Sequence, residues 1–212
     1  MQVKGILFDL DGTLLDSMKI WDTIGNDYFS SLGIETEENL TETFRYMSLQ
    51  QSAEYYQSVY HVKKSTDQII SEINKMVEAF YKEQAELKSG VRKILEICSK
   101  RNIKMCIATA IDRYIVDAAL SRLEIARYFA EIITCNEIGY GKDSIEFFSK
   151  ALSVIGTEKE DTLVFDDAFH AVETAKRAGF QVVGVYDASE PEQEKIKALA
   201  DYYIENFTDI EF

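Results

Sequence analysis

The chain has 212 residues, of which 46% are hydrophobic and 28% are charged. These values indicate one or two globular domains with a sizeable core, and they exclude a large multidomain assembly and wholesale disorder. The formal net charge is −14, so the surface repels phosphate backbones and anionic lipids. We therefore expect no binding to nucleic acid or to membranes. A small phosphorylated substrate remains compatible with this charge, because a metal ion reverses the field locally.

Cysteine usage and the start of the chain bear on the compartment. Cys98, Cys106 and Cys135 have no metal-type spacing, and their odd number argues against a disulfide framework. We interpret them as buried free thiols in a reducing environment. No stretch approaches the ~20 apolar residues of a membrane span, and the first residues lack the pattern of an export signal. We expect a cytoplasmic protein that is a monomer or a weak dimer.

The first predicted strand is followed by a long segment of different character. Val3–Phe8 is an apolar run, whereas residues 17–88 hold no convincing strand. Helices are expected there over Met18–Leu32, Glu37–Tyr46, Leu49–Val59 and Asp67–Leu87. Ser65 and Gln68 are spaced as a capping box for the last of these. The pattern predicts an all-helical insertion between the first strand and the rest of the sheet.

Beyond this insertion, short apolar runs alternate with helix-like segments. The expected strands are Ile103–Ala108, Ile132–Thr134, Thr162–Phe165, Val182–Tyr186 and Tyr202–Ile204. The expected helices are Val91–Lys100, Asp112–Leu123, Ser144–Ile155, Phe169–Ala178 and Glu192–Leu199, with Pro191 where the last one starts. This alternation predicts an α/β fold with a Rossmann-like, mainly parallel sheet covered on both faces. The continuous apolar strands fit such a buried sheet.

The first strand leads directly into an acidic motif. Residues 9–17 read DLDGTLLDS. Ligands of open parallel sheets bind beyond the C-terminal ends of the strands, which places Asp9 at the functional edge. The carboxylates of Asp9 and Asp11 repel each other unless a cation is present.

This motif resembles the first motif of the haloacid-dehalogenase-like superfamily, and the resemblance covers nearly the whole chain. Thr109, at the end of an apolar run, matches the second motif, Gly141-Lys142 the third and Asp166-Asp167 the fourth. The chain is similar to the phosphoglycolate phosphatase and β-phosphoglucomutase subgroup. The resemblance implies a catalytic core of residues 1–16 and 89–212 and an α-helical cap of residues 17–88.

The resemblance also implies the roles of the acidic residues. Mg²⁺, a hard cation that prefers oxygen ligands, would be bound by Asp9, the backbone carbonyl of Asp11 and the side chain of Asp167, with Asp166 close by. Asp9 would be the nucleophile, since a carboxylate can attack phosphorus and form an aspartyl-phosphate. Asp11 would act as general acid and base. The metal would offset the repulsion between the carboxylates and polarise the transferring phosphoryl group.

Four further positions are suited to the phosphate of the substrate. Gly12 lets the backbone bend sharply and approach the phosphate. Thr109 offers a hydroxyl, Ala110 an amide N–H and Lys142 a positive charge. Two of these matches depart from the family pattern. Asp143 stands where proline is frequent, and we interpret it as the N-cap of the next helix. Ala110 stands where the second motif often has asparagine or serine, so one possible side-chain hydrogen bond is absent.

Four functions are compatible with these motifs. The first is a Mg²⁺-dependent phosphatase that acts on a small phosphorylated metabolite. The second is a sugar phosphomutase similar to β-phosphoglucomutase, although Trp21 stands where that subgroup typically has a histidine. The third is carbon–halogen or carbon–phosphorus cleavage, which the presence of Asp11 disfavours. The fourth is a non-catalytic binding module, which the complete set of polar groups disfavours.

Substrate selection is expected to depend on the cap. Arg45, Lys75, Trp21 and the cap tyrosines are the candidates, and the sequence alone does not place them. His170 follows the fourth motif by about one helical turn, and we interpret it as a structural or solvent-facing residue. The phosphatase is the favoured function, and the mutase is the alternative.

Overall fold

Two compact units make up the chain. The computed structural model describes residues 3–34, 43, 47 and 49–210. Met1–Ser17 and Ala85–Phe212 form one unit, here called the core unit, and Met18–Gln84 form the other, here called the helical unit. Arg45 and, apart from Thr43, the helix expected over Glu37–Tyr46 lie outside the described residues.

The core unit is built on one parallel sheet. Its six strands follow the order β5-β4-β1-β6-β7-β8, and each neighbouring pair is parallel. They are β1 (Gly5–Phe8), β4 (Lys104–Thr109), β5 (Glu131–Thr134), β6 (Thr162–Asp166), β7 (Gln181–Val185) and β8 (Tyr202–Ile204). Every residue of β1 and β6 is buried, as continuous apolar strands between two helical layers should be. The predicted α/β fold class is confirmed.

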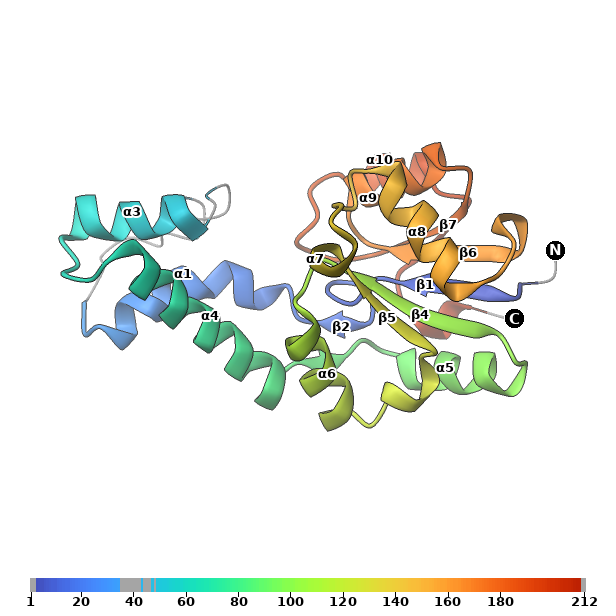
Figure 1. The fold of residues 1–212 in the computed structure, drawn as a ribbon, viewed down its shortest axis with the longest axis horizontal. Coiled ribbons are helices and arrows are strands. Elements are labelled where there is room, and N and C mark those ends of the chain that lie inside the picture. Colours follow the sequence, from blue (N-terminus) through green and yellow to red (C-terminus); the bar gives the residue numbers. More distant parts are fainter. Residues whose placement is uncertain (1–2, 35–42, 44–46, 48, 211–212) are drawn as a thin grey trace. The chain divides into compact units, whose positions relative to one another are not determined.

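Helices cover both faces of this sheet. They are α5 (Val91–Lys100), α6 (Arg113–Arg122), α7 (Cys135–Ile138), α8 (Ile145–Ile155), α9 (Phe169–Arg177) and α10 (Gln193–Leu199), with short 3-10 turns η1 (Ala126–Tyr128), η2 (Lys159–Asp161) and η3 (Phe207–Asp209). In Figure 1, α8, α9 and α10 lie on one face, and α5 and α6 lie on the other. Phe147 and Phe148 of α8 pack in one buried cluster with Val164 of β6 and Val182 of β7.

A small antiparallel ribbon belongs to the core unit and is formed by the residues on either side of the helical unit in the sequence. Strand β2 (Leu15–Asp16) pairs with β3 (Glu86–Leu87), so that Leu15 faces Leu87. The expectation that a helix continues to Leu87 was therefore wrong for its last residues, and a short strand does lie within residues 17–88. Pairing with β2 takes the place of another helical turn, and the amide of Lys88 extends it by donating to the carbonyl of Leu14 at 2.9 Å.

The described elements of the helical unit are α1 (Lys19–Ser31), α3 (Leu49–Tyr60) and α4 (Thr66–Glu83). The predicted capping box is confirmed, because the Ser65 side chain accepts from the amide of Gln68 and the Gln68 side chain accepts from the amide of Ser65. Buried aromatic residues join the helices. The Tyr56 hydroxyl donates to the carbonyl of Gly25 at 2.8 Å, and its ring meets that of Tyr28 edge to face.

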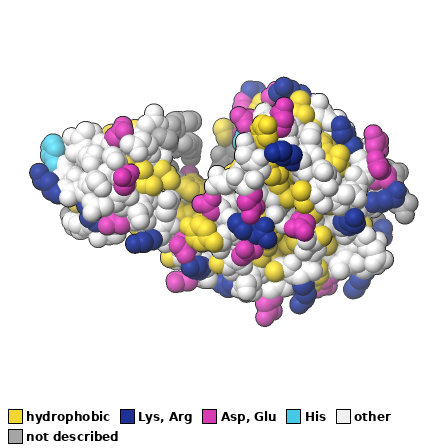
Figure 2. Space-filling model, in the orientation of Figure 1, with side chains coloured by type: hydrophobic (Ala, Val, Ile, Leu, Met, Phe, Trp, Pro, Cys, Tyr) yellow, Lys and Arg dark blue, Asp and Glu magenta, His cyan; other side chains and the backbone are white. Residues whose placement is uncertain are grey.

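The three cysteines are free, as predicted, and Cys98 and Cys106 are buried whereas Cys135 is only half-buried. Burial raises the pKa of the Cys98 and Cys106 thiols to about 11. Among the described helices, none has both the length and the apolar character needed to cross a bilayer. On the face shown in Figure 2, acidic and basic side chains are interspersed.

Candidate active site

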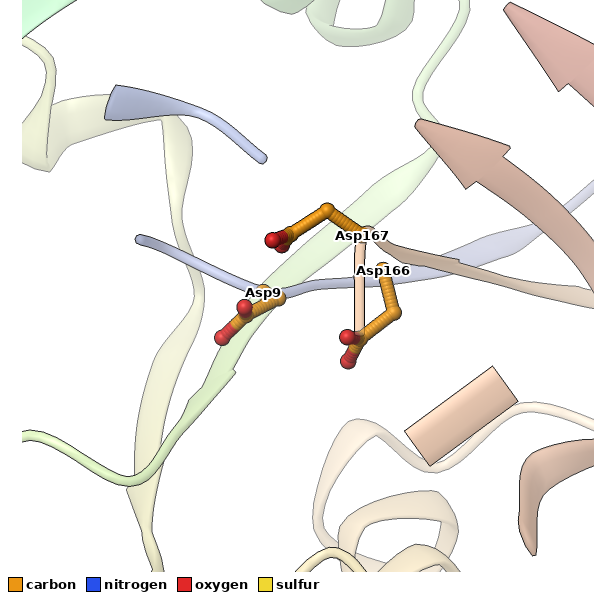
Figure 3. A group of neighbouring side chains, drawn as sticks. All are labelled: Asp9, Asp166 and Asp167. Atoms are coloured by element: carbon orange, nitrogen blue, oxygen red, sulfur yellow. The ribbon is translucent and has the colours of Figure 1, made fainter. Parts of the chain in front are cut away.

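Three aspartates meet at the C-terminal edge of the sheet. Asp9 follows β1, Asp166 is the last residue of β6, and Asp167 comes next. Strands β1 and β6 are paired, and the amide of Asp9 donates to the carbonyl of Phe165 at 2.9 Å. One carboxylate oxygen from each aspartate lies within 4.8 Å of the others (Figure 3). The three buried carboxylates therefore lie close together because two neighbouring parallel strands, β1 and β6, end at this edge of the sheet.

Lys142 is the cation of this cluster. It lies between α7 and α8, and its side chain is 6% exposed. Its Nζ contacts Oδ1 of Asp9 and donates to Oδ2 of Asp166 at 2.8 Å. Burial opposes the charge, yet the facing carboxylates of Asp166 and Asp9 outweigh it and hold the pKa of the ammonium above its ordinary value. Lys142 is therefore charged, and it is shared between two aspartates.

One ammonium does not balance three carboxylates. Burial raises the pKa of Asp9 to about 7, Lys142 lowers it, and the charges of Asp166 and Asp11 raise it. Burial, with the charges of Asp9 and Asp166, also holds the pKa of Asp167 well above its usual range. If all three aspartates ionise, the cluster carries two uncompensated negative charges. This oxygen-only donor set with excess negative charge fits a hard divalent cation such as Mg²⁺.

The loop after β1 closes on the third aspartate. Gly12 has a φ of +71°, and a Cβ placed there would lie 2.2 Å from Oδ2 of Asp167. The hydroxyl of Thr13 donates to Oδ1 of the same carboxylate at 2.8 Å. The turn is held by amides of Leu14 and Leu15, which both donate to the carbonyl of Leu10. Glycine is required at this position for its backbone conformation and for the close approach of Asp167.

We expect Gly12→Ala to lower turnover by about 100-fold, because the new methyl group displaces Asp167 from the carboxylate cluster. Gly33→Ala is the matched control, since Gly33 has a φ of +69° and no atom of the described residues lies within 4 Å of the place its new methyl group would take. Both variants carry the same backbone strain, and only one disturbs the cluster. Steady-state kinetics of the two proteins measure the difference. Equal losses in both would contradict the steric explanation.

The remaining predicted residues lie at the same edge or near it. Thr109 ends β4, which pairs with β1, and its buried hydroxyl accepts from the amide of Ile111 at 3.2 Å. Ala110 follows it and is exposed. Asp11 is half-buried, and the hydroxyl of Ser17 donates to its Oδ1 at 2.5 Å. The structure thus brings Asp9, Lys142, Asp166 and Asp167 together, with Gly12 against Asp167. Thr109 ends the strand that pairs with β1, and Asp11 and Ala110 lie in the loops that follow β1 and β4.

Two expectations about neighbouring residues have clear outcomes. The interpretation of Asp143 as a helix N-cap was wrong, because the N-cap of α8 is Ser144, whose hydroxyl accepts from the amide of Glu146. A serine one residue later supplies the same acceptor. His170 is exposed on α9, as expected for a solvent-facing residue. In the helical unit, Trp21 is half-buried on α1 and Lys75 is exposed on α4.

Sequence reasoning missed four residues of this region. Thr13 and Ser17 belong to the motif itself, and their hydroxyl groups were the available signal. Lys88 and Asp187 form an ion pair beside the loop, with 2.8 Å between Nζ and Oδ2. No local pattern marks this pair, because its members follow β3 and β7 and meet only in the folded chain.

The raised carboxylate pKa values predict the pH dependence of stability. In the folded, metal-free protein Asp9 keeps its proton up to about pH 7, whereas in the unfolded chain it loses it near 3.8. The folded state binds more protons in this window, so the contribution of Asp9 to the free energy of unfolding falls as pH rises from about 4 to 7. Added Mg²⁺ should therefore raise the melting temperature more at pH 8 than at pH 5.

Thermal unfolding with Mg²⁺ and with NaCl of equal ionic strength measures this effect. In metal-free buffer, Asp9→Asn should weaken the pH dependence of the melting temperature, since the variant lacks the titrating carboxyl group of Asp9. An equal Mg²⁺ effect at both pH values would show that the ion does not compete with protons on these carboxylates.

Comparison with known proteins adds an independent line of information. A model of the family described as haloacid dehalogenase-like hydrolase matches residues 6–185. A phosphorylated carbohydrates phosphatase from Thermotoga maritima is 23% identical over 179 residues, covering 84% of this chain and 83% of the relative. Pyrophosphatase PpaX from Oceanobacillus iheyensis is 26% identical over 219 residues, covering 99% of this chain and 96% of the relative.

A solved structure shares the architecture. A Thermotoga maritima protein provisionally described as a β-phosphoglucomutase has a TM-score of 0.85 with this chain at 22% identity, covering 96% of this chain and 94% of that one. This likeness shows that the chain shares the fold of that structure. In this chain the fold is an α/β sheet with an inserted helical segment.

Proposed function

Because the chain belongs to the haloacid dehalogenase-like hydrolase family, as its four motifs predicted, we propose that it is a Mg²⁺-dependent phosphatase that hydrolyses a small phosphomonoester. The observation that carries the proposal is the buried cluster of Asp9, Asp166 and Asp167 around Lys142 at the C-terminal edge of the sheet. Such a cluster is costly to bury unless it serves a charged ligand.

Asp9 acts as the nucleophile in this proposal. Its carboxylate oxygen attacks phosphorus, the bond between phosphorus and the leaving oxygen breaks, and Asp11 protonates the leaving alcohol. Asp11 then takes a proton from water, which attacks the aspartyl-phosphate and releases inorganic phosphate and free Asp9. The hydrogen bond from Ser17 holds the Asp11 carboxyl group in place between these two steps.

The other residues bind and orient. Asp9, the backbone carbonyl of Asp11 and Asp167 would hold Mg²⁺, with Asp166 adjacent, and the bound ion would neutralise charge on the phosphoryl group. Lys142, Thr109 and the amide of Ala110 would bind phosphate oxygens, and Gly12 would let the backbone approach the phosphate, since its own amide donates to the carbonyl of Leu15. Phosphoryl transfer depends mainly on such positioning and charge neutralisation.

The substrate is proposed to be a small phosphorylated metabolite, with residues 17–88 acting as the cap that selects its leaving group and residues 1–16 and 89–212 as the catalytic core. The names of relatives such as the phosphorylated carbohydrates phosphatase favour a sugar or polyol phosphate. We propose a cytoplasmic protein that acts as a monomer or a weak dimer, consistent with three free cysteines.

A panel of sugar phosphates, polyol phosphates, phosphoglycolate and nucleoside monophosphates, assayed with Mg²⁺ and with a chelator, tests the proposal. We expect inorganic phosphate from at least one ester, and no release after chelation. Glucose 1-phosphate provides the discriminating arm, because conversion to its isomer without free phosphate would identify a mutase and contradict the proposal. Failure to act on any ester would also contradict it.

A further inference from the structure

Lys88 lies at the point where the chain re-enters the core unit. It follows β3, and its side chain is 15% exposed. The ammonium group has three partners. It contacts the carbonyl of Gly12, donates to the carbonyl of Tyr186 at 2.7 Å, and lies 2.8 Å from Oδ2 of Asp187. One largely buried cation therefore joins the turn after β1 to the end of β7.

This ammonium group is fully satisfied. Lysine has three N–H donors, and Lys88 meets three oxygen acceptors. The carboxylate of Asp187 is 8% exposed, and its other oxygen accepts from the amide and the hydroxyl of Ser189 at 2.9 and 2.7 Å. The pair is thus rigidly held on both sides. Buried ion pairs contribute little net stability, so their value lies in the geometry that they fix.

The group that Lys88 holds belongs to the carboxylate cluster. The carbonyl it contacts is that of Gly12, whose Cα packs against the carboxylate of Asp167. The next residue, Thr13, donates to that same carboxylate. A continuous set of contacts therefore runs from Asp187 through Lys88 and Gly12 to Asp167. Lys88 touches neither Asp9 nor Asp167 in any contact that the structure shows, so it acts through the backbone.

We propose that Lys88 is a positioning residue, which fixes the Gly12–Thr13 turn against Asp167 and thereby sets the affinity of the cluster for a divalent cation. The inference rests on the proposed function only in taking this cluster as the metal site. Residues that orient metal ligands from one contact away typically account for 10–100-fold in metal affinity. Lys88 lies one contact further from Asp167, with Gly12 between them, so we expect an effect at the lower end of this range.

Direct binding of Mn²⁺, followed by electron paramagnetic resonance without substrate, tests the inference. Lys88→Met keeps most of the apolar stem and removes the charge, and we expect it to weaken Mn²⁺ binding by about 10-fold. Lys88→Arg keeps a cation with several donors and should bind Mn²⁺ more tightly than the methionine variant. The kinetic counterpart is a higher Mg²⁺ requirement with little change in kcat at saturating Mg²⁺.

Lys176→Met is the matched control. Lys176 also forms an ion pair in the core unit, 2.7 Å from both oxygens of Asp201, and it has no contact with the turn. Unchanged Mn²⁺ affinity in Lys88→Met, or an equal loss in Lys176→Met, would overturn the inference. If Lys88→Met does not fold, Asp187→Asn replaces it, with a smaller loss expected and an unchanged affinity overturning the inference.

These outcomes separate the inference from the proposed function. A wild-type protein that releases no phosphate from any ester, yet binds Mn²⁺ in a Lys88-dependent way, would refute the phosphatase and leave the positioning role standing. A protein that releases phosphate in a Mg²⁺-dependent way, but whose Mn²⁺ affinity is unchanged in Lys88→Met, would support the phosphatase and overturn the positioning role. A wild-type protein that binds no Mn²⁺ would overturn the inference.

Discussion

Asp9→Asn will abolish phosphate release, with a loss of at least ~10³-fold in kcat, because the amide cannot attack phosphorus. The substitution is nearly isosteric, and it removes one of the three carboxylates that compete for a single buried cation. The folded protein should therefore be retained and be somewhat more stable in metal-free buffer at neutral pH. A loss of activity accompanied by a higher melting temperature is the expected combination.

Two measurements check this result. Steady-state phosphate release gives the loss in kcat, and thermal unfolding shows that the variant is folded. The control is Asp201→Asn, which removes a carboxylate of the core unit that pairs with Lys176, and which should keep wild-type turnover. Activity within about 10-fold of wild type in Asp9→Asn would show that another group attacks phosphorus.

The second large effect is expected from Lys142→Met. The substitution leaves the buried carboxylates of Asp9 and Asp166 without their cation. Breaking a buried ion pair by removing one partner costs about 3–5 kcal/mol. Turnover should fall by about 10²–10³-fold, because a positioned positive charge is lost from the site of phosphoryl transfer. Both effects come from one ammonium group that two aspartates share.

The pH dependence of this variant follows from the same charges. Lys142 lowers the pKa of Asp9, so its loss raises that pKa further. The unpaired carboxylates then take up protons as pH falls. The loss in the free energy of unfolding caused by Lys142→Met should therefore be smaller at pH 5.5 than at pH 7.5. For the same reason, the acidic limb of kcat/KM should move to higher pH, because the nucleophile must be ionised.

Urea unfolding at both pH values and a pH profile of kcat/KM measure these effects. Lys176→Met serves as control, since its ion pair with Asp201 is more exposed and should contribute only ~0–1 kcal/mol. A destabilisation of Lys142→Met that is the same at both pH values would contradict the assignment of its cost to unpaired carboxylates.

The sheet was the part of the fold that the sequence predicted best. Each strand of a doubly covered parallel sheet is apolar over its whole length, so β6 was expected over Thr162–Phe165 and occurs over Thr162–Asp166. Helix α5 was predicted at its observed bounds, Val91–Lys100. The capping box of α4 was also a local signal, carried by Ser65 and Gln68.

Elements fixed by tertiary contacts were not predicted. Glu86–Leu87 continues a helical pattern in the sequence, and only its pairing with Leu15–Asp16 makes it a strand. The short helix α7 was also absent from the prediction, because it has a single turn that Gly139 ends in a left-handed conformation. Local periodicity carries no information about such pairings or about so short a helix.

Some residues of the candidate site were likewise predicted from the sequence, whereas others are defined only by tertiary contacts. Asp9 was placed at the functional edge because it directly follows an apolar strand, whereas Asp166 and Asp167 were assigned from the resemblance to the family's fourth motif; the structure brings the three carboxylates together. The contact of Lys142 with Asp9 and Asp166 was not foreseen, since Lys142 was assigned only to phosphate. The ion pair between Lys88 and Asp187 could not be predicted from the sequence, because a lysine after a strand resembles a surface residue until its burial is known.

The central claim is that one divalent ion and one nucleophilic aspartate share a single pocket at the C-terminal ends of β1 and β6. A crystal structure of the protein with Mg²⁺ and beryllium fluoride tests it most directly. The account predicts Mg²⁺ bound by oxygens of Asp9 and Asp167, and the beryllium attached to the Asp9 carboxylate. Mg²⁺ bound elsewhere, or beryllium fluoride attached to another residue, would contradict it.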